Sequence, residues 1–303
     1  MKRKTAGILA LSVAAVLLLG TAVVSAQGEK GAPIAENLEL TTYRETAVEG
    51  KLKAVSTEGE AVSFEITTPP TKGSIELNDS GSFVYTPGQG KRGKDYFGYK
   101  AIDESGRSSS EATVIIRLIK PGCAVTYSDM SGNGAHYAAM ALAERDIFVG
   151  ERIGGDYVFN PEAPVSRGEF LTMCMKLVDA DILQGVITTG FADDEQIPAH
   201  QKPYVSTALL TGVISGYSSG YKTAVFSGDA EISYPEAAVI LNKAMCLSDV
   251  KFDEEYVGVP VWAAQACANL SACKISGYMD APALTRAQCA KLLCGALEIL
   301  DNR

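Results

Sequence analysis

The feature that most constrains the fold of this chain is a short sequence motif that occurs three times in its C-terminal half. In each copy a Ser or Thr is followed three residues later by Glu or Gln, next to an apolar stretch. This spacing is that of a capping box, in which the two side chains satisfy free N–H groups at a helix start reciprocally. Three boxes in three similar segments indicate an internal repeat. The predicted capping pairs are Ser166 with Glu169, Ser233 with Glu236, and Thr285 with Gln288.

The segments around these motifs share the same predicted order of turns and helices. An acidic turn precedes a first helix, and a loop then leads to the capping box and a second helix; the turns are at Asp129, Asp193 and Phe252-Asp253. Glycine adopts the left-handed conformation that ends helices at little cost. We therefore expect the first helices to end at Gly150, Gly216 and Gly277.

Apolar residues recur in the second helices at the i, i+3, i+4, i+7 spacing of one helix face. Two such sets are Phe170, Met173, Cys174 and Leu177, and Ala290, Leu293, Cys294 and Leu297. A helix pair with so large an apolar face cannot hide it alone, so the units should pack into one core. The sequence predicts an all-α bundle of three helix-loop-helix repeats at residues 127–182, 189–247 and 252–300.

The preceding part of the chain, residues 33–119, alternates apolar and polar side chains instead. Val62, Phe64 and Ile66 are interleaved with polar residues, which is the pattern of half-buried strands. Turn-forming stretches such as 78–81 and 103–106 separate the runs. Short strands with hairpin signals between them predict an all-β sandwich. Residues 120–126 form a short linker to the helical part.

The first 26 residues have the three-part layout of a secretory signal. Met1 to Lys4 is basic, the run from Ala6 is uncharged and mostly apolar, and small residues close it at Ala26. We expect cleavage after Ala26, export, and no membrane contact afterwards. An uncleaved anchor is the alternative, because the run is long enough to span a bilayer.

The charge of the chain narrows its partners. It carries 27 basic and 36 acidic residues, and the first 26 residues hold three of the basic and none of the acidic ones, so the remainder has 24 basic residues and a net charge of −12. Such a chain is a poor binder of polyanions, and nucleic acid is not an expected partner. An anionic ligand would need local cationic groups.

The cysteines favour neither a metal site nor a redox site. Their spacing contains no CxxC or Cys/His motif, so no metal and no cofactor are expected. An odd count in a chain of this size favours small buried apolar side chains, with a disulfide framework as the alternative. The seven are Cys123, Cys174, Cys246, Cys267, Cys273, Cys289 and Cys294.

A family resemblance appears in the predicted sandwich. The stretches 68–75, 81–87, 93–99 and 103–106 resemble the bacterial Ig-like, cadherin-like repeats of surface proteins. Such repeats often ligate calcium near the end of the second strand, but this chain has Ser56-Thr57-Glu58 there. Calcium is therefore not expected, and Asp103 is interpreted as a turn former.

The helical part resembles the S-layer homology (SLH) domain in three copies. The stretches that carry the resemblance are 159–170, 197–200 with 212–216, and 259–262 with 284–288. The resemblance implies a pseudo-threefold bundle whose grooves bind a secondary cell-wall polysaccharide, commonly pyruvylated and associated with peptidoglycan. It assigns the arginine after the capping hydroxyl to the groove, here Arg167 and Arg286.

That role has a physical basis, because a helix start is a natural anion site and arginine can bind a carboxylate bidentately. The second copy departs from the pattern with Tyr234 in place of arginine, so one or two working grooves are expected. Trp262 stands at the family's tryptophan position, where the second copy has His200. The polysaccharide-binding candidates are Arg167, Arg286, Asp129, Asp193, Trp262, Gly150 and Gly216.

Simpler roles remain open for several of these residues. The capping side chains could only close helix ends, and Asp129 and Asp193 could cap loops instead of binding sugar hydroxyls. Neither His136 nor His200 lies in a catalytic motif, so no enzyme is expected. The leading function is noncovalent anchoring of an exported protein at the cell wall, displaying an Ig-like domain on the surface. The alternatives are a structural component of an S-layer lattice and a wall-modifying enzyme with an unrecognised site.

Overall fold

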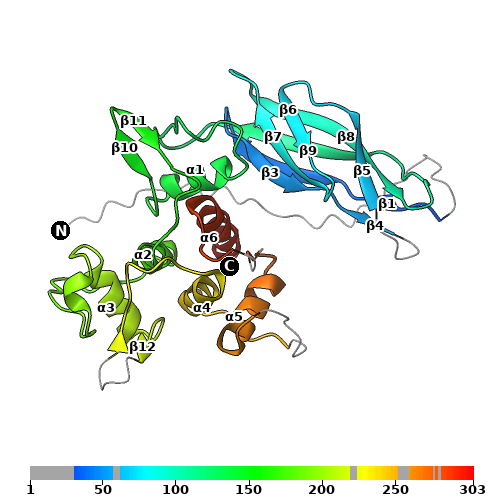
Figure 1. The fold of residues 1–303 in the computed structure, drawn as a ribbon. Coiled ribbons are helices and arrows are strands. Elements are labelled where there is room, and N and C mark those ends of the chain that lie inside the picture. The colour runs from blue at the N-terminus through cyan, green and yellow to red at the C-terminus, as the bar shows by residue number, and fades with distance from the viewer. Residues whose placement is uncertain (1–30, 57–61, 219–223, 252–258, 276, 279–280) are drawn as a thin grey trace.

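The computed structural model describes residues 31–303 apart from 57–61, 219–223, 252–258, 276 and 279–280. The predicted signal at 1–26 and the acidic turn Phe252-Asp253 lie outside the described residues. The chain forms a β part followed by a helical part (Figure 1). In the described residues, no helix has the length and apolar character needed to cross a membrane.

The β part consists of two main sheets with a short strand pair beside them. The orders are β2-β9-β8-β5, β3-β7-β6 and β1-β4, with β2 parallel to β9 and the other neighbours antiparallel. The strands are β1 (Ile34–Ala35), β2 (Leu38–Tyr43), β3 (Val48–Lys51), β4 (Ala54–Val55), β5 (Val62–Thr68), β6 (Gly73–Leu77), β7 (Ser82–Pro87), β8 (Gly93–Asp103) and β9 (Ala112–Ile119).

Alternation along the strands builds the core of the sandwich. On β9 the side chains of Val114, Ile116 and Leu118 are buried, while Arg117 between them is exposed. Asp103 is the turn former predicted from the sequence, because its carboxylate accepts the backbone N–H of Arg107 at 2.8 Å and its Nε at 2.7 Å. The predicted all-β region is therefore confirmed.

The described residues of the helical part form six α-helices, with short hairpins between some of them. The first helices of the predicted repeats are α1 (His136–Glu144), α3 (Lys202–Leu210) and α5 (Val261–Ala272), and the second helices are α2 (Arg167–Leu177), α4 (Tyr234–Ala244) and α6 (Arg286–Asp301). The other elements are β10 (Glu151–Ile153), β11 (Asp156–Val158), the 3-10 turn η1 (Asp194–Gln196), β12 (Tyr217–Ser218) and β13 (Ala224–Val225).

All three predicted capping boxes are present. The N-caps of α2, α4 and α6 are Ser166, Ser233 and Thr285, and each exchanges hydrogen bonds with the side chain or backbone of the residue three positions on. The backbone N–H of Ser166 donates to Glu169 at 2.9 Å, and that of Thr285 donates to Gln288 at 2.9 Å. Each such cap contributes about 1 kcal/mol to stability.

A ring of three backbone hydrogen bonds joins the starts of the second helices. Val165, Ile232 and Leu284 each precede an N-cap and are fully or almost fully buried. The N–H of Val165 donates to the carbonyl of Leu284 at 3.0 Å, that of Leu284 to Ile232 at 2.8 Å, and that of Ile232 back to Val165 at 2.9 Å. The helices α2, α4 and α6 therefore begin around one common point.

The predicted ends of the first helices are wrong. The helices end at Glu144, Leu210 and Ala272, and the left-handed residues that follow their C-caps are Asp146, Gly212 and Lys274. Gly150 and Gly216 come later, at the entries to the two hairpins, with φ of 77° and 73°. Glycine is needed at both positions, because a Cβ at position 150 would lie 2.6 Å from the carbonyl oxygen of Val158 and a Cβ at position 216 would lie 2.5 Å from the ring of Phe191.

The sandwich and the helical part share an interface. Tyr43 of β2 stacks on Tyr137 of α1 with ring centroids 5.4 Å apart, and its hydroxyl donates to Glu144 at 2.7 Å. The N–H of Tyr137 donates to the carbonyl of Ala47 at 3.1 Å, and Lys291 pairs with Glu49. These contacts fix the two parts against each other, in keeping with the short linker.

All seven cysteines lie in the described part of the chain and carry free thiols. Four are buried, at Cys174, Cys267, Cys289 and Cys294. Burial raises the pKa of Cys267 to about 11 and that of Cys294 to about 12, so these thiols are protonated at neutral pH. They serve as apolar packing groups, as the sequence suggested.

Candidate functional site

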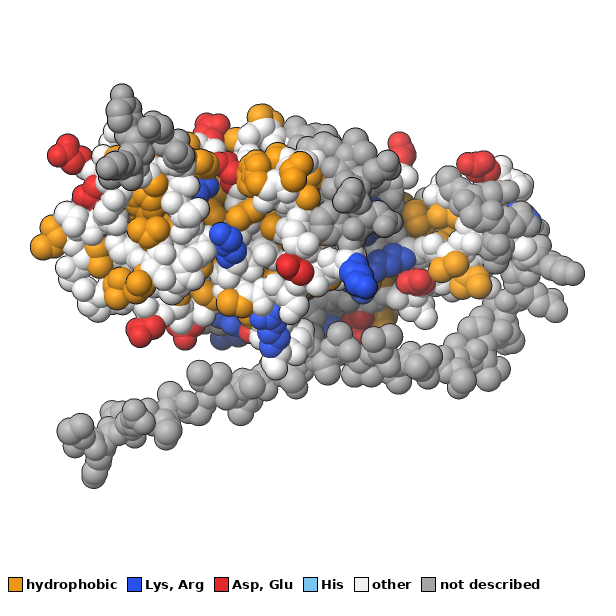
Figure 2. Space-filling view, turned by 90° about the horizontal axis from the view of Figure 1, so that it is seen from below, with side chains coloured by type: hydrophobic (Ala, Val, Ile, Leu, Met, Phe, Trp, Pro, Cys, Tyr) orange, Lys and Arg blue, Asp and Glu red, His pale blue; other side chains and the backbone are white. Residues whose placement is uncertain are grey.

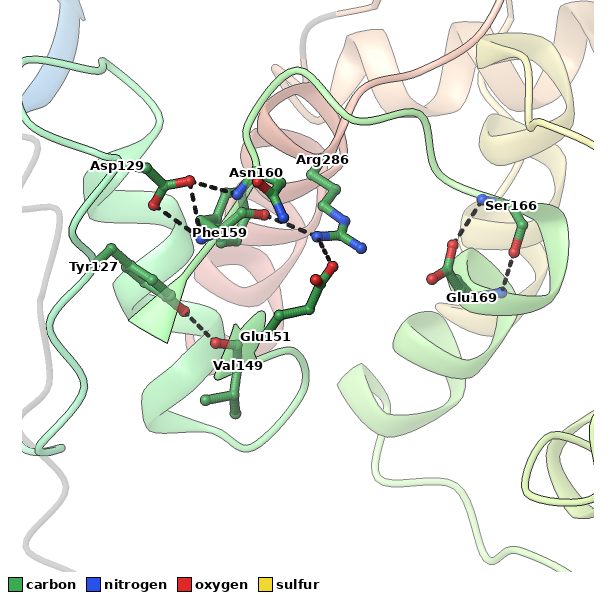
Figure 3. Close-up of polar contacts among 9 residues, drawn as sticks. All are labelled: Tyr127, Asp129, Val149, Glu151, Phe159, Asn160, Ser166, Glu169 and Arg286. Carbon is green, nitrogen blue, oxygen red and sulfur yellow. Dashed lines mark hydrogen bonds and ion pairs between the residues drawn. The ribbon is translucent and has the colours of Figure 1, made fainter. Parts of the chain in front are cut away.

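The first candidate cluster surrounds Arg286 at the start of α6. Its Nη1 donates to Glu151 at 2.7 Å and to the carbonyl oxygen of Phe159 at 3.2 Å (Figure 3). The ring of Phe148 lies 5.4 Å from the guanidinium carbon. The Arg286 side chain is only 14% exposed. We call these residues the Arg286 cluster.

Asp129 positions the loop that supplies the Phe159 carbonyl. Its carboxylate accepts the backbone N–H of Phe159 at 2.9 Å and that of Asn160 at 2.6 Å (Figure 3). Asn160 has a φ of 54°, a left-handed conformation that asparagine tolerates better than most residues. The structure therefore gives Asp129 the loop-capping role.

The second cluster surrounds Arg167 at the start of α2. Its guanidinium lies over the ring of Tyr217 at 4.7 Å and near the ring of Phe226 at 5.7 Å. Its nearest carboxylate is that of Glu236, at 3.7 Å. Arg167 is 8% exposed, and its Nε is buried without a hydrogen-bond partner among the described residues. We call these residues the Arg167 cluster.

The two clusters are built in the same way. Asp193 accepts the N–H groups of Phe226 at 2.8 Å and Ser227 at 2.7 Å, and Ser227 is again left-handed, with a φ of 55°. The backbone N–H of Arg167 donates to Ala230 of this loop, just as that of Arg286 donates to Ala163 of the first loop, each at 2.8 Å. Each cluster therefore joins the first turn of one second helix to a hairpin and loop from another repeat.

The acids and the phenol of the clusters are tuned by these contacts. The hydrogen bond from Arg286 and the charge of this residue lower the pKa of Glu151. Burial would raise the pKa of Glu236, but hydrogen bonds from Tyr217 and Ser233 and the charge of Arg167 outweigh it, so that pKa is lowered. Burial and the hydrogen bond to Glu236 raise the pKa of Tyr217 to about 12. At neutral pH both carboxylates are charged and the phenol is protonated.

This arrangement suits the binding of an anion. A cation in the first turn opposes the helix dipole, so each arginine is held where a helix alone disfavours it. The first three N–H groups of both helices, α2 and α6, already have partners, so the guanidinium must supply the donors for a carboxylate or phosphate. In the Arg167 cluster the Nε–H is a donor that no described residue uses.

The place equivalent to the arginines in the remaining repeat holds a tyrosine ring. Tyr234 is the first residue of α4 and is 3% exposed. A Cβ added to Gly277 would lie 2.6 Å from its ring, so the ring packs directly against that glycine. No guanidinium stands at this helix start, as the sequence shows.

The other candidate residues have separate places. Gly150 and Gly216 bend the chain into the hairpins, and the six capping residues close helix starts, with Glu236 also facing Arg167. Trp262 is the second residue of α5 and is 62% exposed. His200 is exposed as well.

Glu151 and Tyr217 were not among the residues predicted from the sequence. Both lie at the start of a hairpin whose strands are too short to show periodicity. The pair Gly154-Gly155 between the short runs 151–153 and 156–158 is a two-residue hairpin signal that could have revealed the first of them.

The surface gives no general attraction for polyanions on the face seen in Figure 2. Among the described residues coloured there, basic side chains stand singly or in small groups between acidic, apolar and uncharged ones. This face therefore shows no broad basic patch that would attract a polyanion.

Comparisons with known proteins identify two domains. A family model for the bacterial Ig domain matches residues 30–117, and one for the S-layer homology domain matches residues 126–171. The SLH match covers residues 127–171 of the first predicted repeat, which runs to 182, and the capping boxes at Ser233 and Thr285 lie beyond it. No curated protein matches the chain.

Solved structures match the chain only in part. An endo-fucoidan hydrolase of glycoside hydrolase family 107, MfFcnA4, is 23% identical with a TM-score of 0.26, over 31% of this chain and 14% of that one. The D00-D0 domain of intimin is 15% identical with a TM-score of 0.23, over 31% and 50%. The Clostridium thermocellum CbhA fibronectin(III)-like modules are 14% identical with a TM-score of 0.22, over 29% and 47%. The chain thus spans a small share of the hydrolase and about half of the other two.

The family models agree with the sandwich and with the helical segment up to residue 171. An SLH domain indicates a bacterial protein that is anchored at the cell wall and located at the cell surface. The chain accordingly contains a bacterial Ig domain at residues 30–117, followed by an S-layer homology domain at residues 126–171.

Proposed function

We propose that the chain is exported, that its helical part binds a secondary cell-wall polysaccharide noncovalently, and that its Ig domain is thereby displayed on the surface. The ligand group is a carboxylate on the polymer, such as a pyruvyl ketal. The polymer is attached to peptidoglycan. The proposal assigns the chain no catalytic role.

The Arg167 cluster is the observation that carries the proposal. A guanidinium buried to this degree normally has its donors satisfied, because burying an unpaired charged donor is costly. Here one donor has no partner among the described residues, two aromatic rings flank the guanidinium, and the nearest carboxylate is 3.7 Å away. A ligand carboxylate would complete the hydrogen bonding of this arginine.

The ring of Val165, Ile232 and Leu284 supports three SLH repeats in a pseudo-threefold arrangement. Its three hydrogen bonds follow one another in a cycle, and each links the position before an N-cap to the same position in another repeat. Repeats placed in this way would bring each second-helix start next to the hairpin of a neighbour. Two of the three junctions have an arginine, and Tyr234 occupies the third.

Sedimentation with purified wall sacculi of the producing bacterium tests the proposal. The chain without its first 26 residues is used, because Tyr43 of the sandwich packs into the helical core and truncating the sandwich would disturb that core. We expect co-sedimentation with intact sacculi and none with sacculi stripped of their polysaccharide by acid.

Variants connect that binding to the clusters. The double variant Arg167→Ala/Arg286→Ala should lose binding, while Tyr234→Phe and Arg92→Ala, an exposed arginine of the sandwich, should retain it. Losing a charge-assisted hydrogen bond costs about 1.5–3 kcal/mol, which is at least about tenfold in affinity. Equal binding by the double variant and the unaltered chain would refute the role of the arginines.

A further inference from the structure

The two arginine clusters differ in the hairpin side chain that contacts the guanidinium. Glu151 and Tyr217 hold equivalent places, since each follows a left-handed glycine and opens the first strand of its hairpin. Their cross-strand partners are also equivalent: Glu151 pairs with Val158 and Tyr217 with Val225, directly before the phenylalanine of each cluster. One position thus has a carboxylate in one cluster and a phenol in the other.

The two side chains meet their arginines in different ways. The carboxylate of Glu151 accepts a hydrogen bond from Nη1 of Arg286 at 2.7 Å, as an anionic ligand would. The ring of Tyr217 instead covers the face of the Arg167 guanidinium at 4.7 Å, and its hydroxyl donates to Glu236. Stacking leaves the in-plane donors of Arg167 for other partners, and its Nε has none among the described residues.

We propose that Glu151 is an internal competitor for the anion site of Arg286, so that the two clusters are unequal binding sites. This inference rests on the proposed function. It adds which of the two clusters binds the ligand carboxylate directly and which residue makes the other cluster a weaker site. The Arg167 cluster takes the ligand carboxylate directly. The Arg286 cluster takes it only when Glu151 is displaced.

The exposure of the two partners fits competition. The Glu151 side chain is 49% exposed, whereas that of Arg286 is 14% exposed and is also held by the Phe159 carbonyl. The acid can therefore turn towards solvent while the arginine stays in place. A partly exposed ion pair of this kind is weak enough for a second carboxylate to replace it.

The experiment measures binding of the chain without its first 26 residues to intact wall sacculi in a series of variants. Arg167→Ala should weaken binding by roughly tenfold or more, and Arg286→Ala by much less. Adding Glu151→Gln to Arg167→Ala should restore most of the lost affinity, because the fork of Arg286 is freed. Adding Arg286→Ala to that pair should remove the recovery.

The matched control is Asp156→Asn, which removes one negative charge from the same hairpin at an exposed position. It should not restore binding to Arg167→Ala. Equal recovery with this control, or no recovery with Glu151→Gln, would overturn the inference while the anchoring function stands. If Arg167→Ala/Arg286→Ala binds as well as the unaltered chain, the proposed function fails and the inference with it.

Discussion

His136 should make the stability of the helical part depend on pH. It is the first residue of α1, it is 6% exposed, and its Nδ1 has no hydrogen-bond partner among the described residues. Burial disfavours the imidazolium form and lowers its pKa from 6.5 to about 4, although the charge of Asp129 opposes the shift. The folded protein therefore holds this imidazole neutral where the unfolded chain protonates it.

The direction and size of the effect follow from linkage. Above pH 6.5 both states hold the imidazole neutral, so it does not affect stability. Between pH 6.5 and 4 the unfolded state binds the extra proton, and stability falls. At 1.36 kcal/mol for each pKa unit, about 2 kcal/mol is lost at pH 5 and about 3 kcal/mol at lower pH.

Urea unfolding at pH 7.5 and at pH 5 measures this loss, with His136→Phe as the test variant. The loss of unfolding free energy between the two pH values should be about 2 kcal/mol smaller in His136→Phe than in the unaltered chain. His200→Phe is the matched control, since His200 is exposed and is the other of the two histidines. NMR titration of the unaltered chain provides a check that needs no variant. A titration midpoint of His136 near 6.5 would refute the reasoning.

Two further predictions concern packing. Gly216→Ala should lower the free energy of unfolding in urea by about 1–3 kcal/mol more than Gly212→Ala, because both glycines are left-handed but only a Cβ at position 216 would contact neighbouring atoms. Equal losses of unfolding free energy in the two variants would contradict the close approach of Phe191. Tyr43→Phe should lower the free energy of unfolding by about 1–3 kcal/mol because it removes the hydrogen bond to Glu144, while Tyr96→Phe at an exposed site should change it little. The same free energy of unfolding for both variants would argue against the interface between the sandwich and the helical part.

Local patterns predicted much of the fold. The alternation of Val62, Phe64 and Ile66 with polar residues located a strand, because that signal depends only on neighbours in the sequence. The capping boxes located the starts of three second helices for the same reason. Both kinds of pattern are short-range and need no knowledge of the tertiary structure.

The ends of the first helices were harder to predict because only α3 of these three helices has a glycine, Gly212, after its C-cap. After α1 the left-handed residue is Asp146, and the N–H of Ile147 donates to the carbonyl of Leu142 at 3.0 Å. This bonding satisfies the helix end as a glycine motif would. The left-handed Asp146 is exposed, and its carbonyl accepts a hydrogen bond from Nζ of Lys176 at 3.0 Å, a contact that no local pattern in the sequence marks.

The candidate site was predicted only in part. Arg167 and Arg286 were found through the repeat, but their partners come from distant segments that only the fold brings together. Glu151 contacts Arg286, which lies far along the sequence near the end of the helical part, and Tyr217 contacts Arg167 from the second predicted repeat. The difference between the two clusters therefore becomes visible only in three dimensions.

The most direct test of the account is the dissociation constant for polysaccharide released by acid from purified wall sacculi. Titration calorimetry would compare the chain without its first 26 residues with Arg167→Ala/Arg286→Ala. The account predicts saturable binding by the unaltered chain and at least about tenfold weaker binding by the double variant. The same dissociation constant for both proteins, or no binding by the unaltered chain, would contradict it.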